Sequence, residues 1–274
     1  MKSPIVSIIL PVYNGSKYIE EAINSVLHQS YEKWELLIIN DGSTDATKDE
    51  IFKFSDRRIK YYEQENRGVS AARNLAIDNM QGDYFCFLDA DDAMTPESLM
   101  ARLNIFKKNS DVSFVDGKVI YMNSNMKPTG REYIPRFKGT PYYNLLRLSS
   151  SCYFGPSWMI RNESKVKYSF REGMTHAEDL LFYLTISKSG KYDYTDKPIL
   201  YYRNNPQSAM KDFKGLEEGY FKLLESVRLD LKPDKPSFHY FKYRVIRIMF
   251  LSHLKDGRDP NSAFRSLFRF LAKA

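Results

Sequence analysis

The sequence has little cysteine and no long hydrophobic run. Two cysteines among 274 residues, Cys86 and Cys152, leave no disulfide framework, which excludes a disulfide scaffold and favours free thiols in a reducing cytosol. No stretch reaches the roughly 18 apolar residues that a membrane-spanning helix needs. The first apolar run is short and ends at Pro11 without a small-residue cleavage site. We therefore interpret it as a strand and not as a signal peptide.

Two glycine-rich nucleotide motifs are also missing. No G-x-G-x-x-G follows the first apolar run, which argues against a dinucleotide site, and no G-x-x-x-x-G-K-[ST] occurs, which excludes a P-loop NTPase. Any phosphate-bearing ligand must therefore be held by other groups.

The net charge of +7 lies at one end of the chain. Residues 232–274 hold ten Lys or Arg and three Asp, and the first 231 residues are neutral. A neutral body with a basic tail offers no charged groove to a polynucleotide, so we expect no nucleic-acid partner. Hydrophobic residues (43%) and charged residues (27%) are near globular averages, which excludes a disordered chain.

Strand-like and helix-like patterns alternate through the first hundred residues. Apolar runs typical of buried strands lie at Val6–Val12, Trp34–Ile39, Ile59–Tyr62 and Tyr84–Leu88. Helical spacing follows over Lys17–Leu27 and from Gly68, and Thr95 and Pro96 are expected to start another helix. This alternation predicts an α/β fold with a mostly parallel central sheet flanked by helices. Ligands bind such sheets beyond the carboxyl ends of the strands.

Later segments follow other patterns. Residues 122–140 are polar and contain two prolines, so we expect a long functional or mobile loop there. A helix is expected over Glu178–Lys188, with Thr175 and Glu178 forming a capping box. We divide the chain into a main domain, residues 1–210, and a helical, basic, amphipathic region, residues 211–274.

The strongest chemical signal is Asp89-Ala90-Asp91-Asp92. Three carboxylates in four residues follow a buried strand, and a divalent cation such as Mn²⁺ or Mg²⁺ would relieve their repulsion. The alternative is a solvated acidic turn, but the buried strand favours a metal site with Asp89 and Asp91 as ligands. A haloacid-dehalogenase signature is disfavoured because Ala93 stands where that motif has Thr or Val.

Four further residues have two interpretations each. Asp179 either complements the dipole of the predicted helix or serves as a general base. Arg73 pairs with a carboxylate or reaches a phosphate. His176 acts in catalysis or is an ordinary polar residue, and Trp158 stacks on a sugar or packs in the core.

Four motifs, in order and at fitting distances, resemble family 2 glycosyltransferases of the GT-A fold. They are Val6–Asn14, Asn40–Asp45, Asn66–Asn74 and Phe87–Asp92, and a looser likeness runs over residues 155–210 through Glu178-Asp179 and Tyr201–Ser208. The resemblance implies a GT-A catalytic domain with a nucleotide-binding half (about 1–110) and an acceptor half (about 111–210).

The resemblance also implies an inverting, metal-dependent transferase that uses a nucleotide-diphosphate sugar, most readily a UDP-sugar. The residues implied for the donor are Pro11, Tyr13 and Asn14 around the base, Asp41 on the uracil imide, Asn66, Gly68 and Arg73 beside the nucleotide, and Asp89, Ala90 and Asp91 at the ribose and metal. Asp179 would be the base, and Trp158, His176 and Glu178 are acceptor-side candidates. The metal-binding His of some GT-A enzymes is absent from residues 201–208, so one or two protein ligands are expected.

Two other functions stay open. A non-catalytic, membrane-associated protein that binds nucleotide sugars is disfavoured because both acidic motifs are intact. A sugar-nucleotide pyrophosphorylase is disfavoured because residues 11–16, the loop after the first strand, contain no Arg.

The chain closes on a predicted amphipathic helix with Asp259 as N-cap and Pro260 at its start. Its apolar stripe is Phe264, Leu267, Phe268 and Leu271, and its basic residues are Arg265, Arg269 and Lys273. Such a helix suits an anionic membrane surface, unless the apolar stripe packs on the main domain. We therefore expect a cytoplasmic enzyme, peripheral on the inner face of the cell membrane, that acts on a glycan or lipid-linked acceptor.

Overall fold

The computed structural model describes residues 3–205, 212–255 and 260–273. The first half contains β1 (Val6–Val12), α1 (Ile19–Leu27), β2 (Trp34–Asp41), α2 (Thr47–Ile51), β3 (Ile59–Gln64), α3 (Val69–Asn79), β4 (Tyr84–Phe87), β5 (Ala93–Met94) and α4 (Ser98–Lys108). The second half contains β6 (Val112–Met122), β7 (Pro128–Tyr133), α5 (Tyr142–Leu146), β8 (Met159–Arg161), α6 (Glu178–Ile186) and β9 (Lys191–Arg203). The C-terminal helices are α7 (Phe213–Ser226), the π-helix η2 (Val227–Leu231), α8 (Lys235–Lys255) and α9 (Pro260–Lys273).

One sheet runs through the molecule in the order β3-β2-β1-β4-β8-β6-β9-β5, with β7 paired to β6. The first four strands are parallel, as predicted, and residues 6–12 of β1 pair in register with residues 34–40 of β2. The later strands mix directions, because β8 is antiparallel to β4 and β6 while β6 and β9 are parallel. The α/β fold is confirmed.

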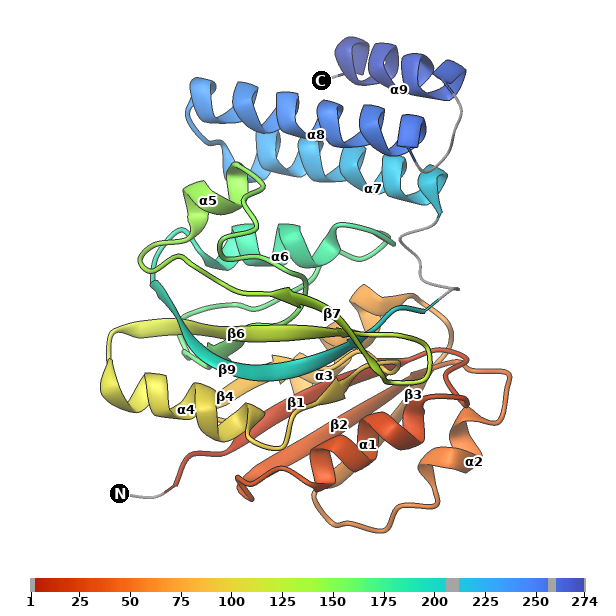
Figure 1. The fold of residues 1–274 in the computed structure, drawn as a ribbon, viewed down its shortest axis with the longest axis vertical. Helices are drawn as coiled ribbons and strands as arrows, with labels where there is room; N and C mark the ends of the chain where they lie inside the picture. Colours follow the sequence, from red (N-terminus) through yellow and green to blue (C-terminus); the bar gives the residue numbers. More distant parts are fainter. Residues whose placement is uncertain (1–2, 206–211, 256–259, 274) are drawn as a thin grey trace.

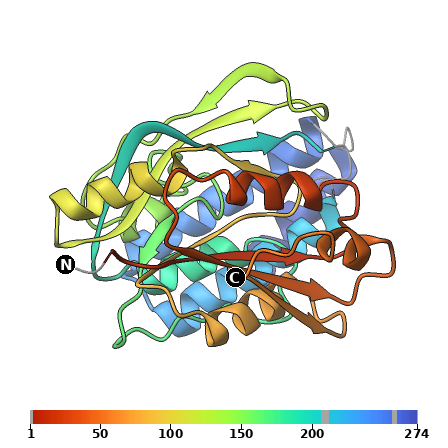
Figure 2. The same ribbon diagram turned by 90° about the horizontal axis from the view of Figure 1, so that it is seen from below.

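Two hydrophobic cores cover opposite faces of the sheet. Ile8 and Leu10 of β1 pack with α1 and α4, whereas Ile9 between them packs with α3 and α6. Both faces of the strand are therefore buried, which explains its continuous apolar run. Figures 1 and 2 show α1 and α4 on one side of the sheet, and Figure 1 shows α6 on the other, between the sheet and α7.

The C-terminal helices stack beyond α6 at one end of the molecule (Figure 1). Their buried residues, including Leu223, Val227, Phe241 and Phe270, belong to the same core as α3 and α6. The division near residue 210 thus separates two sequence regions that share one core. Within the three described ranges, no helix is both long enough and apolar enough to cross a bilayer.

Two local expectations are wrong. Residues 122–140 are not one long loop, because β7 forms a hairpin with β6 in which Tyr133 pairs with Val119. The strand escaped notice because five of its six residues are exposed and only Tyr133 is buried. Thr95 does not cap α4, which begins at Ser98 after Glu97; its hydroxyl donates instead to the carbonyl of Pro198 at 2.6 Å.

Candidate active site

A cavity of about 660 Å³ lies where the chain leaves β4 and passes the start of α6. Asp89 and Asp91 line it from the loop after β4, and Asp179 lines it from the first turn of α6. The fold therefore brings together the two acidic motifs that the sequence singled out, although about 90 residues separate them.

The acidic loop after β4 is fixed by the end of β9. Asp92 is 3% exposed and accepts a hydrogen bond from the Arg203 backbone N–H at 2.8 Å. The Arg203 side chain donates to the Asp91 carbonyl at 2.8 Å, and the Asn205 amide donates to the Asp91 carboxylate at 3.1 Å. Asp92 thus anchors the loop, while Asp89 and Asp91 are partly exposed in the cavity.

Arg73 joins the two acidic motifs. Its buried guanidinium lies 3.1 Å from Asp89 and 2.8 Å from Glu178, and it packs over the Phe170 ring at 5.1 Å. Of the two roles left open by the sequence, the structure shows pairing with carboxylates. Arg73 therefore holds the acidic loop and α6 at a fixed separation.

The capping box predicted at the start of α6 is wrong. The N-cap of α6 is Ala177, in the left-handed conformation (φ 58°), and no side chain caps the helix. Glu178 turns to Arg73 of α3, and the Thr175 hydroxyl lies 3.0 Å from His176 Nδ1. An ion pair with a buried arginine has replaced the local cap, and spacing along the sequence could not show it.

Asp179 has the electrostatic properties of a base. Burial and the neighbouring Glu178 carboxylate raise the pKa of Asp179 to about 7, against the opposing effects of Arg73, the Leu180 N–H and the Tyr153 hydroxyl. The Leu180 N–H donates to Asp179 Oδ1 at 2.7 Å. A base with a pKa near neutrality can accept a proton in one step and release it later at working pH.

The raised pKa predicts a pH-dependent effect of Asp179→Asn on stability. A carboxyl group that binds its proton more tightly in the folded chain makes the fold less stable as pH rises from about 4 to about 7. The cluster already holds Asp89, Asp91 and Glu178, so removing one charge relieves repulsion. We expect Asp179→Asn to raise the thermal midpoint at pH 8 and leave it nearly unchanged at pH 5, measured by calorimetry. A larger gain at pH 5 than at pH 8 would contradict the assignment.

The residues implied for the nucleobase lie outside this cavity. Pro11, Tyr13, Asn14, Asp41, Asn66 and Gly68 lie at or just beyond the carboxyl ends of β1, β2 and β3, and neither they nor Ala90 line it. Tyr13 is 52% exposed, so its ring is accessible to a ligand. Asn14 ties the loop after β1 to the loop after β2, because its side chain accepts from the Thr44 N–H at 2.8 Å.

Asp41 shapes the loop that leads into α3. Its carboxylate accepts hydrogen bonds from the Gln64 amide (2.6 Å) and the backbone N–H groups of Arg67 (2.9 Å) and Gly68 (2.8 Å). A carboxylate has about four acceptor positions. At most one is therefore left for the imide hydrogen of a base.

Two of the acceptor-side candidates, Trp158 and His176, are buried. Trp158 is fully buried, stacks on Tyr183 at 4.2 Å and does not line the cavity, so its assignment to a sugar is wrong. His176 lines the cavity but is only 7% exposed. It is wedged against α7, where a Cβ on Gly219 would come within 2.5 Å of the His176 carbonyl oxygen.

Three residues that line the cavity beside its acidic groups were not among the predicted site residues. Asn205 contacts Asp91, Tyr153 contacts Asp179, and Tyr220 of α7 lies near enough to Asp179 to be affected by its charge. For Asn205 a signal existed, namely its place within the looser likeness at residues 201–208. Tyr153 and Tyr220 come from segments without a motif, so only the fold reveals them.

Asp89 and Asp91 in the loop after β4 suit a divalent metal that a bound ligand also coordinates. Carboxylate oxygens are the ligands that Mg²⁺ and Mn²⁺ prefer, and burial together with Asp89 raises the pKa of Asp91, a cost that a cation would remove. Across the described ranges, no three His, Cys, Asp or Glu residues are grouped to hold a metal by themselves. The residues therefore fit a metal that completes its shell with water or a diphosphate.

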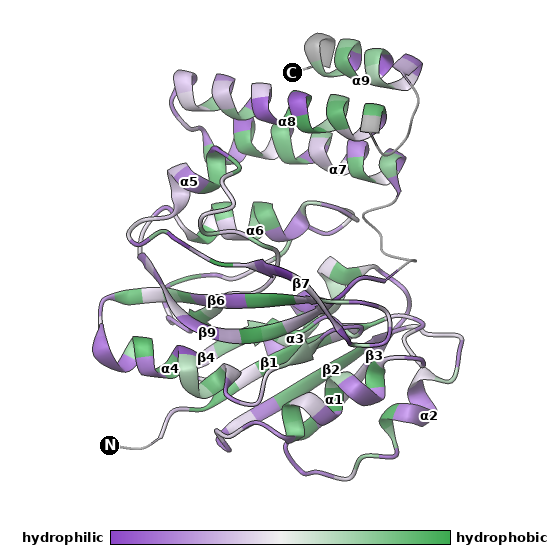
Figure 3. Cartoon of the chain, viewed as in Figure 1, coloured by the Kyte–Doolittle hydropathy of each residue, from purple (hydrophilic) through white to green (hydrophobic). Residues whose placement is uncertain are grey.

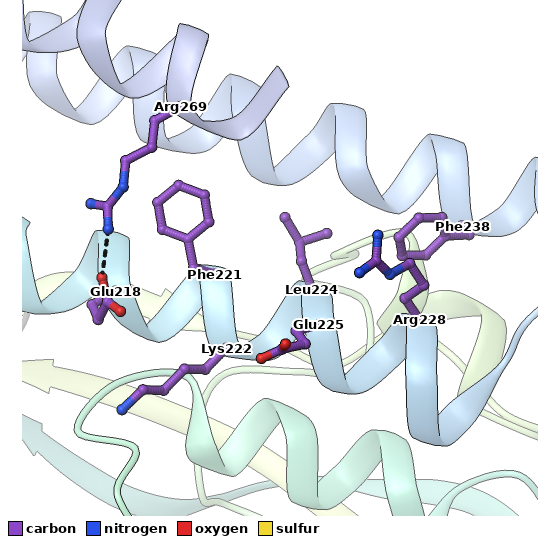
Figure 4. A pocket seen from close by; sticks show the side chains of 8 residues that line it. All are labelled: Glu218, Phe221, Lys222, Leu224, Glu225, Arg228, Phe238 and Arg269. Atoms are coloured by element: carbon purple, nitrogen blue, oxygen red, sulfur yellow. Dashed lines mark hydrogen bonds and ion pairs between the residues drawn. The ribbon is translucent and has the colours of Figure 1, made fainter. Parts of the chain in front are cut away.

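A second cavity, of about 180 Å³, lies between α7 and the helices above it. Figure 4 shows Phe221 and Leu224 of α7 facing the overlying helices, with Arg269 reaching Glu218. It shares no lining residue with the first cavity. Its lining mixes three apolar side chains with five charged ones, and Arg269 is already paired with Glu217 and Glu218. We assign it to the packing of the C-terminal helices.

Comparisons with known proteins agree with this geometry. Residues 7–167, more than half of the chain, match Glycosyl transferase family 2. A mannosyltransferase from Pyrobaculum calidifontis, solved with GDP-Man and Mn²⁺, superposes with a TM-score of 0.65 at 19% identity, covering 100% of this chain and 76% of that one. At that identity the likeness establishes the GT-A fold alone.

Two curated relatives align by sequence. An uncharacterized glycosyltransferase of Rickettsia typhi is 45% identical over 40% of this chain, but the match spans only 35% of that protein. The Escherichia coli UDP-Glc:alpha-D-GlcNAc-diphosphoundecaprenol beta-1,3-glucosyltransferase WfgD is 32% identical over 69% of this chain and 72% of its own length. With the family match and the fold in agreement, the chain belongs to glycosyl transferase family 2.

Proposed function

We propose that this protein is a metal-dependent, inverting glycosyltransferase that moves a sugar from a UDP-sugar to an acceptor hydroxyl. The observation that carries the proposal is one cavity holding Asp89, Asp91 and Asp179, with the pKa of Asp179 raised to about 7. Neither a binding protein nor a pyrophosphorylase needs a base at that position.

The chain's own residues account for the proton and for the geometry. Asp179 accepts the proton of the acceptor hydroxyl while that oxygen forms a bond to the anomeric carbon. The bond from that carbon to the diphosphate breaks, and UDP leaves with its electron pair. One displacement inverts the configuration, so an α-linked donor gives a β-linkage. A divalent cation bound at Asp89 and Asp91 would supply positive charge to the leaving diphosphate.

We take the proposed donor and acceptor classes from one relative. The name of the Escherichia coli relative gives UDP-glucose as its donor and a diphosphate-lipid-linked GlcNAc as its acceptor. We extend the UDP-sugar donor and the lipid-linked glycan acceptor to this chain. Such an acceptor would lie at the membrane, which accords with the basic C-terminal region.

Thermal unfolding with nucleotide sugars tests donor binding. We expect UDP-sugars to raise the thermal midpoint only with Mn²⁺ or Mg²⁺ present; ligand at a hundred times its Kd adds about 2.7 kcal/mol. The control is the same titration in EDTA. Equal protection by GDP-sugars would overturn the UDP assignment, and no protection by any nucleotide sugar would overturn the proposal.

The membrane contact is assigned to the outer face of α9. Phe264 and Phe268 are 52% and 66% exposed, while Ala263 and Phe270 are buried against the other helices. Figure 3 shows hydrophobic and hydrophilic residues alternating along α9. Two residues of the expected stripe, Phe264 and Phe268, are thus exposed. The predicted N-cap Asp259 and the side chain of Leu271 lie outside the described residues.

Flotation with anionic liposomes tests this surface. We expect Phe264→Ser with Phe268→Ser to lower the bound fraction strongly, because two apolar side chains no longer enter the interface, each worth roughly 2 kcal/mol when fully buried. The matched control is Phe52→Ser, just after α2, because the Phe52 side chain is also exposed (59%). Equal flotation of the double variant and the control would exclude α9 as the contact.

A further inference from the structure

The cavity has a second wall that the proposed mechanism does not use. It consists of the rings of Tyr121 from β6, Phe154 from the segment before β8, and Tyr202 from β9, which we call the aromatic wall. Their ring centroids lie 5.1 to 5.6 Å apart and each pair meets edge to face. Tyr133 of β7 packs behind Phe154 at 5.3 Å. Four separate segments therefore converge on this wall.

The aromatic wall extends from the acidic loop to the base. All three rings line the cavity with Asp91 and Asp179. Gly155, next to Phe154, lies against the base, since a Cβ there would be 3.9 Å from Asp179 Oδ2. Asn205, which contacts Asp91, follows Tyr202 by three residues. A molecule resting on the wall would therefore have its edge at Asp179.

The chemistry of the wall suits a sugar ring. It combines apolar ring faces with the two tyrosine hydroxyls and contains no carboxylate, and its three side chains are only partly buried. A pyranose combines the same features, because its C–H bonds form an apolar face and its hydroxyls form a polar rim. The residues implied for the nucleobase lie elsewhere, at the ends of β1 to β3. We therefore place the aromatic wall on the acceptor side of the cavity.

We propose that the aromatic wall binds the terminal sugar ring of the acceptor and directs one of its hydroxyls to Asp179. The inference rests on the proposed function and names the acceptor's recognised part as a carbohydrate ring. A lipid chain would need no hydroxyl partners, and a purely apolar wall would suit it better.

Saturation-transfer NMR tests the contact directly. The full chain is mixed with UDP, Mg²⁺ and the methyl glycosides of GlcNAc, glucose, galactose and mannose, and the protein's aromatic protons are irradiated. We expect the ring protons of at least one glycoside to be saturated. Tyr121→Leu or Phe154→Leu should weaken that binding about tenfold, the scale of one lost aromatic contact.

Control variants distinguish loss of an aromatic ring in the wall from a general effect of substitution on the protein. Phe154→Tyr keeps a ring and should retain the signal, as should Phe52→Leu just after α2. Tyr202→Leu replaces either leucine variant if that variant unfolds. Two results would overturn sugar binding at the aromatic wall. One is saturation of UDP protons without saturation of any glycoside, and the other is an unchanged glycoside signal in every leucine variant. Absence of UDP binding to the unaltered chain would instead count against the proposed function.

Discussion

Asp179→Asn is expected to lower turnover by at least about a hundredfold while leaving donor affinity nearly unchanged, the usual scale for the loss of a general base. The amide cannot take the proton of the acceptor hydroxyl, but it keeps the size of the side chain and the hydrogen bond from the Leu180 N–H. Steady-state kinetics would measure turnover, and calorimetric titration with a UDP-sugar would measure affinity.

The turnover and donor affinity of Asp179→Asn together distinguish a general base from a ligand of the donor. Asp196→Asn, an exposed substitution on β9, is a matched control and should leave both quantities unchanged. If donor affinity fell as steeply as turnover in Asp179→Asn, Asp179 would be a ligand of the donor. Turnover that stayed within a few-fold of normal would remove it from the reaction.

Asp91→Asn should abolish metal-dependent donor binding and transfer without unfolding the chain. The loop keeps its anchors, because Asp92 and Arg203 hold it through contacts that do not involve the Asp91 carboxylate. An amide loses the negative charge on which a divalent cation depends. Donor affinity with and without excess EDTA is the measurement, accompanied by a thermal melt.

Two results would contradict this account of Asp91. One is full activity of the unaltered chain in excess chelator. The other is a donor affinity of Asp91→Asn that still rises on adding Mn²⁺. A large fall in the thermal midpoint would instead give Asp91 a structural role, and the anchoring contacts of Asp92 make that fall unexpected.

The sequence predicted those parts of the fold that depend on local patterns. Apolar runs identified β1, β2 and β4, because strands buried on both faces consist mainly of apolar residues. It missed β7, whose exposed residues follow no apolar pattern. The cap of α6 was predicted wrongly because Glu178 is drawn to Arg73, 105 residues away.

The residues of the candidate site could likewise be predicted only where a local motif marks them. Asp89, Asp91 and Asp179, which line one cavity, were named because they lie in short acidic motifs that the family resemblance covers. The sequence leaves Trp158 between a sugar contact and the core, because its burial depends on the packing of Tyr183 and Cys152 around it. The aromatic wall was invisible, since its rings converge from segments up to 81 residues apart.

The anomeric configuration of the sugar released from a UDP-α-sugar tests the central claim most directly. Water can replace the acceptor, so proton NMR of the full chain with UDP-glucose, UDP-GlcNAc or UDP-galactose and Mg²⁺ follows the first product formed. The account predicts that the β-anomer appears first, that EDTA stops its formation, and that Asp179→Asn slows it by at least about a hundredfold. Initial release of the α-anomer, or release that neither EDTA nor Asp179→Asn affects, would contradict it.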